Sequence, residues 1–150
     1  MEDVINTLIQ IAIKSQVEHK ISAALLHHNK IISIPTCNTY YNSSVSKLYT
    51  THAEINAIKQ LYKSEIYLSP YMNKIIFNKK YNKLDLCVIR VNNKGKLMNS
   101  RPCMHCLKLM KTIGIRNVYY SSSDTTIVKE SVKNMISTHI TSGWRKCQMM

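Results

Sequence analysis

The sequence predicts an α/β domain in which helices pack against a β-sheet. Its predicted elements alternate in the order helix, hairpin, helix, strand, helix, strand, helix, and this alternation is typical of layered α/β domains. The 150 residues fit a single domain, residues 1–150. Hydrophobic residues make up 45% of the chain, an ordinary share for a globular protein, so collagen, coiled coil and wholesale disorder are excluded.

The first elements are a helix and a β-hairpin. Residues 2–16 predict a helix because their apolar residues fall on one face: Ile5, Leu8, Ile9 and Ala12. Residues 21–26 and 31–34 predict two strands, joined by a tight turn at residues 27–30. Residues 35–50 are polar and rich in Ser, Thr and Asn, so we expect a loop there.

A second helix is expected at residues 51–64. Thr51 can cap its start, and Glu54, three residues on, would complete a capping box. Residues 65–83 are basic and rich in tyrosine and are interrupted by Pro70, so we interpret them as an irregular insertion. Tyrosines interleaved with lysines suit either ordinary packing or a platform on which bases stack.

The second half of the chain continues with a buried strand at residues 84–91, followed by a turn and a short strand at residues 96–98. Pro102 suits the first turn of a helix, which we expect to run to Ile113. Gly114 suits the C-terminal cap of that helix. We expect a strand at residues 116–120, a helix at residues 125–135 and a loose tail at residues 141–150.

The charge balance is strongly basic. Lys and Arg number 21 against 8 Asp and Glu, which gives a formal net charge of +13. Such a charge attracts phosphates and nucleic acid, although a lysine-rich solvated surface has the same composition. Membrane-spanning helices are not expected, since no apolar run approaches ~18 residues. With no secretory signal and an odd count of 5 cysteines, we expect a soluble intracellular protein without structural disulfides.

Two motifs at predicted helix starts carry the chemistry. They are His52-Ala53-Glu54 and Pro102-Cys103-Met104-His105-Cys106. Two cysteines three residues apart share one helical face, so both sulfurs can reach one metal ion, and His52 can add an imidazole. Three protein ligands with a vacant fourth position are typical of catalytic zinc, which activates water near neutral pH.

Each of these residues also has an ordinary structural interpretation. The cysteines could be a buried pair, His52 a core histidine and Glu54 a capping residue. The combination favours chemistry, because a carboxylate two residues from a metal ligand can accept and deliver protons. His105 is expected to be a surface residue, since a fourth protein ligand would close the site.

His-x-Glu followed by Pro-Cys-x-x-Cys resembles the signature of the zinc-dependent cytidine and deoxycytidylate deaminase superfamily. The resemblance extends from about Ile21 to Ser122 and includes uncharacterised deaminase-like proteins of fungi and large DNA viruses. It implies a three-layer α/β/α fold with a central mixed sheet and a homo-oligomer. It also implies that His52, Cys103 and Cys106 bind zinc, and that Glu54 moves protons.

The same resemblance suggests substrate contacts for Asn38, with the sugar, and for the Ala53 backbone, with the base. Arg101 precedes the cysteine motif, where it could hold a phosphate or a nucleic-acid backbone, or remain solvated. The favoured reaction is deamination of cytosine in a free nucleoside or nucleotide. One alternative is a deaminase that acts on bases within RNA or DNA. Another is a non-enzymatic basic protein that binds nucleic acid or belongs to a virion.

Overall fold

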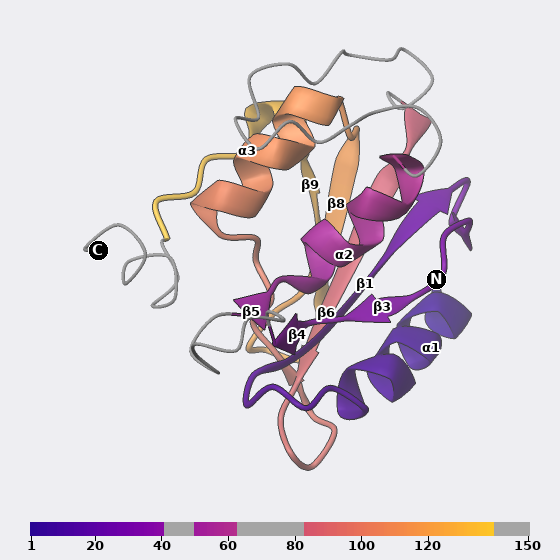
Figure 1. Ribbon diagram of the computed structural model, residues 1–150, viewed down its shortest axis with the longest axis vertical. Coiled ribbons are helices and arrows are strands. Elements are labelled where there is room, and N and C mark those ends of the chain that lie inside the picture. The colour runs from indigo at the N-terminus through magenta and orange to yellow at the C-terminus, as the bar shows by residue number, and fades with distance from the viewer. Residues whose placement is uncertain (41–49, 63–82, 140–150) are drawn as a thin grey trace.

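The computed structural model describes residues 1–40, 50–62 and 83–139. Within them a 7-stranded sheet has the order β2-β1-β6-β8-β9, with β3 beside β1 and β7 beside β6, and β4 pairs with β5 in a 2-stranded sheet (Figure 1). β6 and β8 are parallel, whereas the other paired strands are antiparallel. The strands are β1 (Lys20–His27), β2 (Lys30–Ile31), β3 (Thr36–Cys37), β4 (Thr39–Tyr40), β5 (Thr50–Thr51), β6 (Asp85–Val91), β7 (Leu97–Met98), β8 (Asn117–Ser121) and β9 (Ile127–Ser131).

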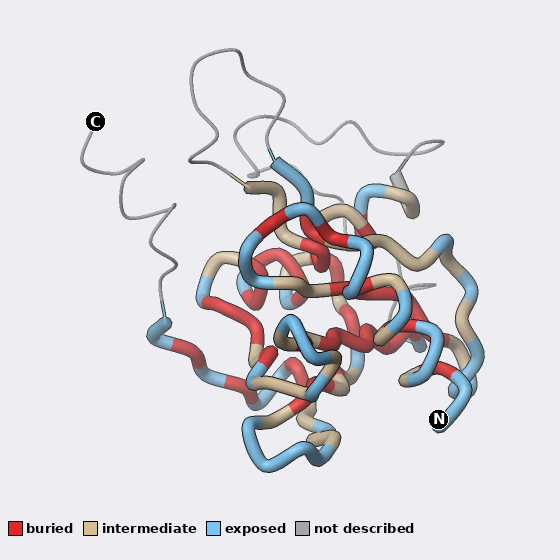
Figure 2. The backbone as a smooth tube through the Cα atoms, turned by 90° about the horizontal axis from the view of Figure 1, so that it is seen from below, coloured by how far each residue is buried: buried red, intermediate tan, exposed pale blue. Residues whose placement is uncertain are grey.

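Helices cover both faces of the sheet. α1 (Glu2–Ile13) lies on one face, and α2 (Ala53–Lys59) and α3 (Met104–Ile113) lie on the other (Figure 1). The alternation of side chains along β6 divides the core accordingly. Leu86 and Val88 pack in the cluster with α2 and α3, whereas Cys87 and Ile89 pack in the cluster with α1. Figure 2 shows that the buried parts of the described chain, in red, lie in the interior of the fold. The predicted three-layer α/β/α architecture is confirmed.

The predicted hairpin between β1 and β2 is confirmed, with a shorter second strand. His28 and Asn29 form its loop with φ values of 50° and 61°. Two consecutive positive φ angles match the type I′ turn, whose twist suits antiparallel strands. Regular pairing ends at Ile31 rather than at Ile34. Beyond it, the backbone of Ile34 exchanges two hydrogen bonds, of 2.8 and 2.7 Å, with the side-chain amide of Gln60.

The sequence predicts a loop at residues 35–50, but the described part of this range, residues 35–40 and 50, contains short strands. β3 pairs with β1 through Ser22 and Ala23, and β4 pairs with β5. The prediction was wrong here because each strand is only two residues long and has no periodicity of its own. These strands form because a neighbouring strand offers unpaired backbone groups, which is a tertiary effect.

The expected helix at residues 125–135 is also wrong. Residues 127–131 form β9, which pairs antiparallel with β8, and a 3-10 turn, η3 (Val132–Asn134), follows. Adjacent β-branched residues such as Ile127 and Val128 favour a strand, and the free edge of β8 provides the partner. The predicted insertion at residues 65–83 lies outside the described residues except for Lys83, and the predicted tail at residues 141–150 lies wholly outside them. The division of the chain into one domain stays a prediction.

Cys37, Cys87, Cys103 and Cys106, the described cysteines, form no disulfide among themselves. None of the helices in the described residues has both the length and the apolar character that a membrane crossing requires.

Asp85 joins the two parallel strands, so replacing it by alanine should destabilise the fold. This carboxylate is 2% exposed and accepts two hydrogen bonds from Arg116, of 3.1 and 2.9 Å, and two from Asn117, of 3.2 and 3.1 Å. Arg116 is partly exposed and can form hydrogen bonds with water once the carboxylate is removed, which limits the cost of losing its partner. We therefore expect the free energy of unfolding to fall by about 2 kcal/mol. Urea denaturation measures it. Asp124→Ala, in an exposed turn, should change it by less than about 0.5 kcal/mol, and equal effects of the two variants would contradict the prediction.

Candidate metal centre

His52 lies where β5 ends and α2 begins. It is the N-cap residue of α2, with extended backbone angles of φ −66° and ψ 148° and no side-chain capping hydrogen bond. The predicted capping box of Thr51 and Glu54 is therefore wrong. Thr51 belongs to β5, where it pairs with Thr39, and this pairing shifts the start of the helix by one residue. The imidazole of His52 is thus available for contacts outside its own helix.

Cys103 occupies the same position at the start of α3. Its backbone is extended, with φ −71° and ψ 167°, and its sulfur accepts a long hydrogen bond of 3.5 Å from the backbone N–H of Cys106. Pro102 therefore precedes the cap, instead of occupying the first turn as predicted. The helix ends as predicted at Gly114, whose φ of 90° favours glycine. Backbone N–H groups at this helix start favour negative charge on sulfur.

These helix starts bring three side chains together. The Nδ1 atom of His52 is 3.1 Å from the Sγ of Cys106 and 3.7 Å from the Sγ of Cys103. All three donor atoms lie within 4.8 Å of one another. Tetrahedral zinc with bonds of about 2.0 Å to nitrogen and 2.3 Å to sulfur separates its ligand atoms by about 3.5–3.8 Å. The set has the composition, and nearly the spacing, of a zinc site.

The electrostatics of the group favour a thiolate. The hydrogen bond from Cys106, helped by contact with His52, lowers the pKa of Cys103 to about 3. The same side-chain hydrogen bond with Cys103, together with burial, raises the pKa of Cys106. The hydrogen bond with Cys103 raises the pKa of His52. The sulfur of Cys103 is therefore ready to bind a cation as a thiolate. Metal binding by Cys106 as well would release its thiol proton.

Glu54 is buried beside this group, in the first turn of α2. Its side chain is 4% exposed, and its Oε2 atom has no hydrogen-bond partner in the described part of the chain. Burial raises its pKa, and the charge of His52 partly opposes that shift. An unpartnered buried carboxylate oxygen costs folding free energy. Such an atom next to three metal donors is consistent with a metal centre, where it can contact the molecules that bind to the cation.

His105 lies between the two cysteines but outside their cluster. The metal-binding group contains His52, Cys103 and Cys106. His105 is half-buried, and burial lowers its pKa. Among the residues that the structure describes, the group therefore has three protein donors, the number typical of catalytic zinc.

Comparison with known proteins identifies the family. The family model described as the cytidine and deoxycytidylate deaminase zinc-binding region matches residues 2–122. The chain belongs to this family. It is a zinc-dependent deaminase, and His52, Cys103 and Cys106 are positioned to hold the metal.

The fold of the deaminase agrees with this assignment. It resembles the crystal structure of cytidine deaminase from Burkholderia pseudomallei with a TM-score of 0.62 and 14% sequence identity. The match covers 93% of this chain and 98% of that one. No curated protein matches the sequence.

Both polar side-chain atoms of Asn38 form hydrogen bonds within the deaminase itself. The side-chain oxygen accepts hydrogen bonds from the Ser15 hydroxyl, at 2.6 Å, and from the Ile21 backbone, at 3.2 Å. The side-chain nitrogen donates to the carbonyl of His19 at 2.5 Å. Asn38 thus ties the start of β1 to the segment that leads toward His52, and its contact with a sugar stays a prediction.

Ala53 and Arg101 flank the metal ligands along the chain. Ala53 is fully buried as the first residue of α2, and its carbonyl accepts a hydrogen bond of 3.3 Å from Thr36. The guanidinium of Arg101 contacts Glu130 and the carbonyl of Ile136. The sequence alone did not identify Glu130 or the segment after β9 as neighbours of this loop, because no local spacing links them to it.

Proposed function

We propose that this deaminase acts on cytosine in a free nucleoside or nucleotide. The observation that carries the proposal is the convergence of His52, Cys103 and Cys106 beside the unpartnered carboxylate oxygen of Glu54. The family to which the chain belongs supports the choice of base, since its description names cytidine and deoxycytidylate.

The proposed reaction replaces the amine of the base by oxygen. Water adds to the amine-bearing ring carbon, the carbon–nitrogen bond breaks, and ammonia leaves. Zinc, when bound by His52, Cys103 and Cys106, supplies the Lewis acidity that lets water ionise near neutral pH. Glu54 takes a proton from water at its free oxygen, delivers it to the ring nitrogen and assists protonation of the departing amine. Ala53 and Asn38 are the proposed contacts of base and sugar.

The direct test is a substrate screen. Purified, zinc-loaded protein is incubated with cytidine, deoxycytidine, their monophosphates, guanine, and short RNA and DNA, and released ammonia is measured. We expect turnover with at least one of the free cytosine compounds. Ammonia release from guanine or from oligonucleotides alone would contradict the proposed substrate class.

A second candidate is deamination of bases within RNA or DNA, which the net charge of +13 favours. Such an enzyme should bind oligonucleotides with an affinity that falls steeply as salt rises. Binding that is absent or insensitive to salt eliminates this candidate.

The proposal also covers the oligomeric state of the protein and its compartment in the cell. The resemblance to deaminases favours a homo-oligomer, which light scattering on purified protein measures. Cys103 and Cys106 must stay reduced to bind zinc, which suits a reducing intracellular compartment, either a cellular cytoplasm or that of a virus-infected host.

A further inference from the structure

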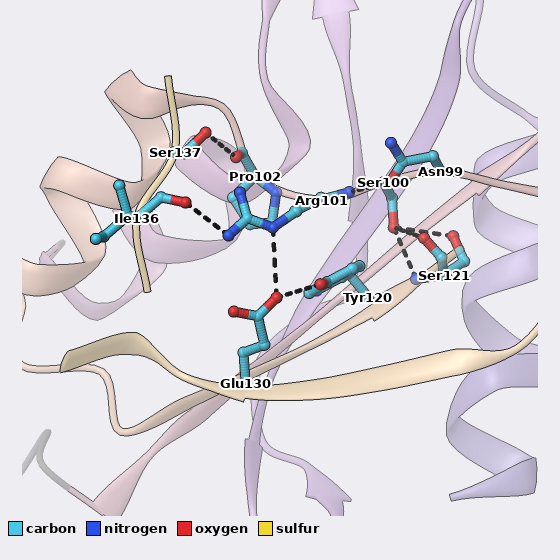
Figure 3. A network of polar contacts seen from close by, with 9 residues as sticks. All are labelled: Asn99, Ser100, Arg101, Pro102, Tyr120, Ser121, Glu130, Ile136 and Ser137. Carbon is cyan, nitrogen blue, oxygen red and sulfur yellow. Dashed lines mark hydrogen bonds and ion pairs between the residues drawn. The ribbon is translucent and has the colours of Figure 1, made fainter. Parts of the chain in front are cut away.

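Arg101 lies in the loop before Cys103, and its side chain forms hydrogen bonds toward β9 and the segment that follows it. Its Nε atom donates to the Oε1 atom of Glu130 at 3.3 Å, and its Nη2 atom donates to the carbonyl of Ile136 at 2.6 Å (Figure 3). Its backbone N–H donates to the side chain of Asn99 at 3.0 Å. The arginine therefore spans from the loop before Cys103 to two later parts of the chain.

Glu130 is itself fixed to the sheet. It lies in β9, and its Oε1 atom also accepts a short hydrogen bond from the hydroxyl of Tyr120 in β8 (Figure 3). The hydrogen bond from Tyr120 and the nearby Arg101 lower the pKa of Glu130, so the carboxylate is ionised at neutral pH. The positive charge of Arg101 is thus compensated within the protein.

Residues 135–139, which we call the strap, run along the start of α3. The Ser137 hydroxyl donates to the carbonyl of Pro102 at 3.1 Å (Figure 3). The backbone N–H of Met104 donates to the carbonyl of His139 at 2.8 Å. Met135 anchors the strap, since its side chain is 1% exposed and packs in the core cluster of α3. The strap consequently contacts the residues immediately before and after Cys103.

We propose that Arg101 is a positioning residue for the metal centre. Together with Glu130 it fastens the strap to the loop, and this holds Cys103 at the start of α3, opposite His52. Metal sites need this support because ligand distances must be kept within about 0.2 Å, and loss of an outer partner commonly weakens metal binding about 10-fold to 100-fold. The inference rests on the metal centre and is independent of which base is deaminated.

A double-mutant cycle tests the proposal with Arg101→Met, Glu130→Gln and the double variant. Zinc affinity is measured by competition with a chromogenic chelator, which requires no turnover. We expect each single variant to bind zinc about 10-fold to 100-fold more weakly, and the double variant to lose little more than either single one. Arg101→Lys, which keeps the charge but not the planar fork, should recover part of the affinity.

Lys108→Met is the matched control, because Lys108 is an exposed cation on α3, the helix that Cys103 caps. It should keep the zinc affinity of the wild type. Ser137→Ala removes a single strap contact and should weaken zinc binding by a smaller factor, which keeps the proposal testable if a larger change prevents folding. Melting temperatures of the zinc-free proteins show which variants are folded.

Other outcomes would overturn the proposal. Unchanged zinc affinity in folded Arg101→Met and Glu130→Gln would do so, as would fully additive losses in the double variant. A direct role in binding substrate phosphate gives another pattern. Arg101→Met would then raise KM for a nucleotide but not for a nucleoside, whereas Glu130→Gln and zinc affinity would show no parallel change.

Discussion

Replacing Glu54 by glutamine should slow ammonia release by at least about 100-fold while the protein still binds zinc. The carboxylate is buried, and its Oε2 atom has no hydrogen-bond partner in the described residues, so it is the group available to move protons. Glutamine has nearly the same shape but cannot accept and release a proton at this oxygen. Loss of general acid–base catalysis typically lowers turnover by about 100-fold to 10,000-fold. We expect a fall of that size in kcat.

The measurement pairs a steady-state ammonia assay with the zinc content of the same protein sample. Glu18→Gln, a change of the same chemistry at an exposed carboxylate, should retain the activity of the wild type. A Glu54→Gln variant that deaminates as fast as the wild type would remove Glu54 from the mechanism. Loss of zinc together with activity would instead mean that Glu54 supports the metal centre structurally.

Local backbone chemistry explains which parts of the fold the sequence reveals. The I′ turn at His28 and Asn29 and the left-handed cap at Gly114 are set by a few adjacent residues. The same holds for the metal ligands, because His52 and the cysteine pair lie in short motifs at two helix starts. Residues that must bind one ion carry their chemistry in their own side chains, so side-chain type and spacing suffice to find them.

The parts that the sequence does not reveal depend on distant partners. β9 forms on the free edge of β8, although residues 125–135 suggest a helix. The predicted capping box at Thr51 does not form, because Thr51 pairs with Thr39 of β4 and belongs to strand β5. Arg101 lies in the loop before α3 and meets Glu130 only once β9 has paired with β8, so nothing near Arg101 in the chain predicts its partner. In each case tertiary pairing outweighs a local preference.

The two helix starts show how backbone geometry positions the metal donors. His52 and Cys103 are both N-cap residues with extended backbone angles. An N-cap side chain normally folds back to accept hydrogen bonds from its own helix. His52 makes no such bond, and Cys103 makes only the long one from Cys106. Both side chains can therefore point toward the space between the helices, where Cys106 completes the group.

Replacing Cys106 by alanine should remove zinc binding and, with it, activity and the stabilisation that zinc provides. The sulfur is fully buried and lies 3.1 Å from the Nδ1 atom of His52, so no other described donor replaces it. With two of three protein ligands left, the affinity should fall by at least about 100-fold. A ligand present at 100 times its Kd stabilises the folded state by about 2.7 kcal/mol, and the variant should lose this increment.

Thermal unfolding with zinc and with a chelator distinguishes loss of the metal site from loss of packing. In the wild type, chelation should lower Tm, whereas in Cys106→Ala the two curves should coincide because no zinc is bound. His105→Ala is the neighbouring control and should keep the zinc-dependent difference, since His105 lies outside the group of donors. A Cys106→Ala protein that still gains stability from zinc would show that the metal binds elsewhere. The pair of helix starts would then have to be explained by packing alone.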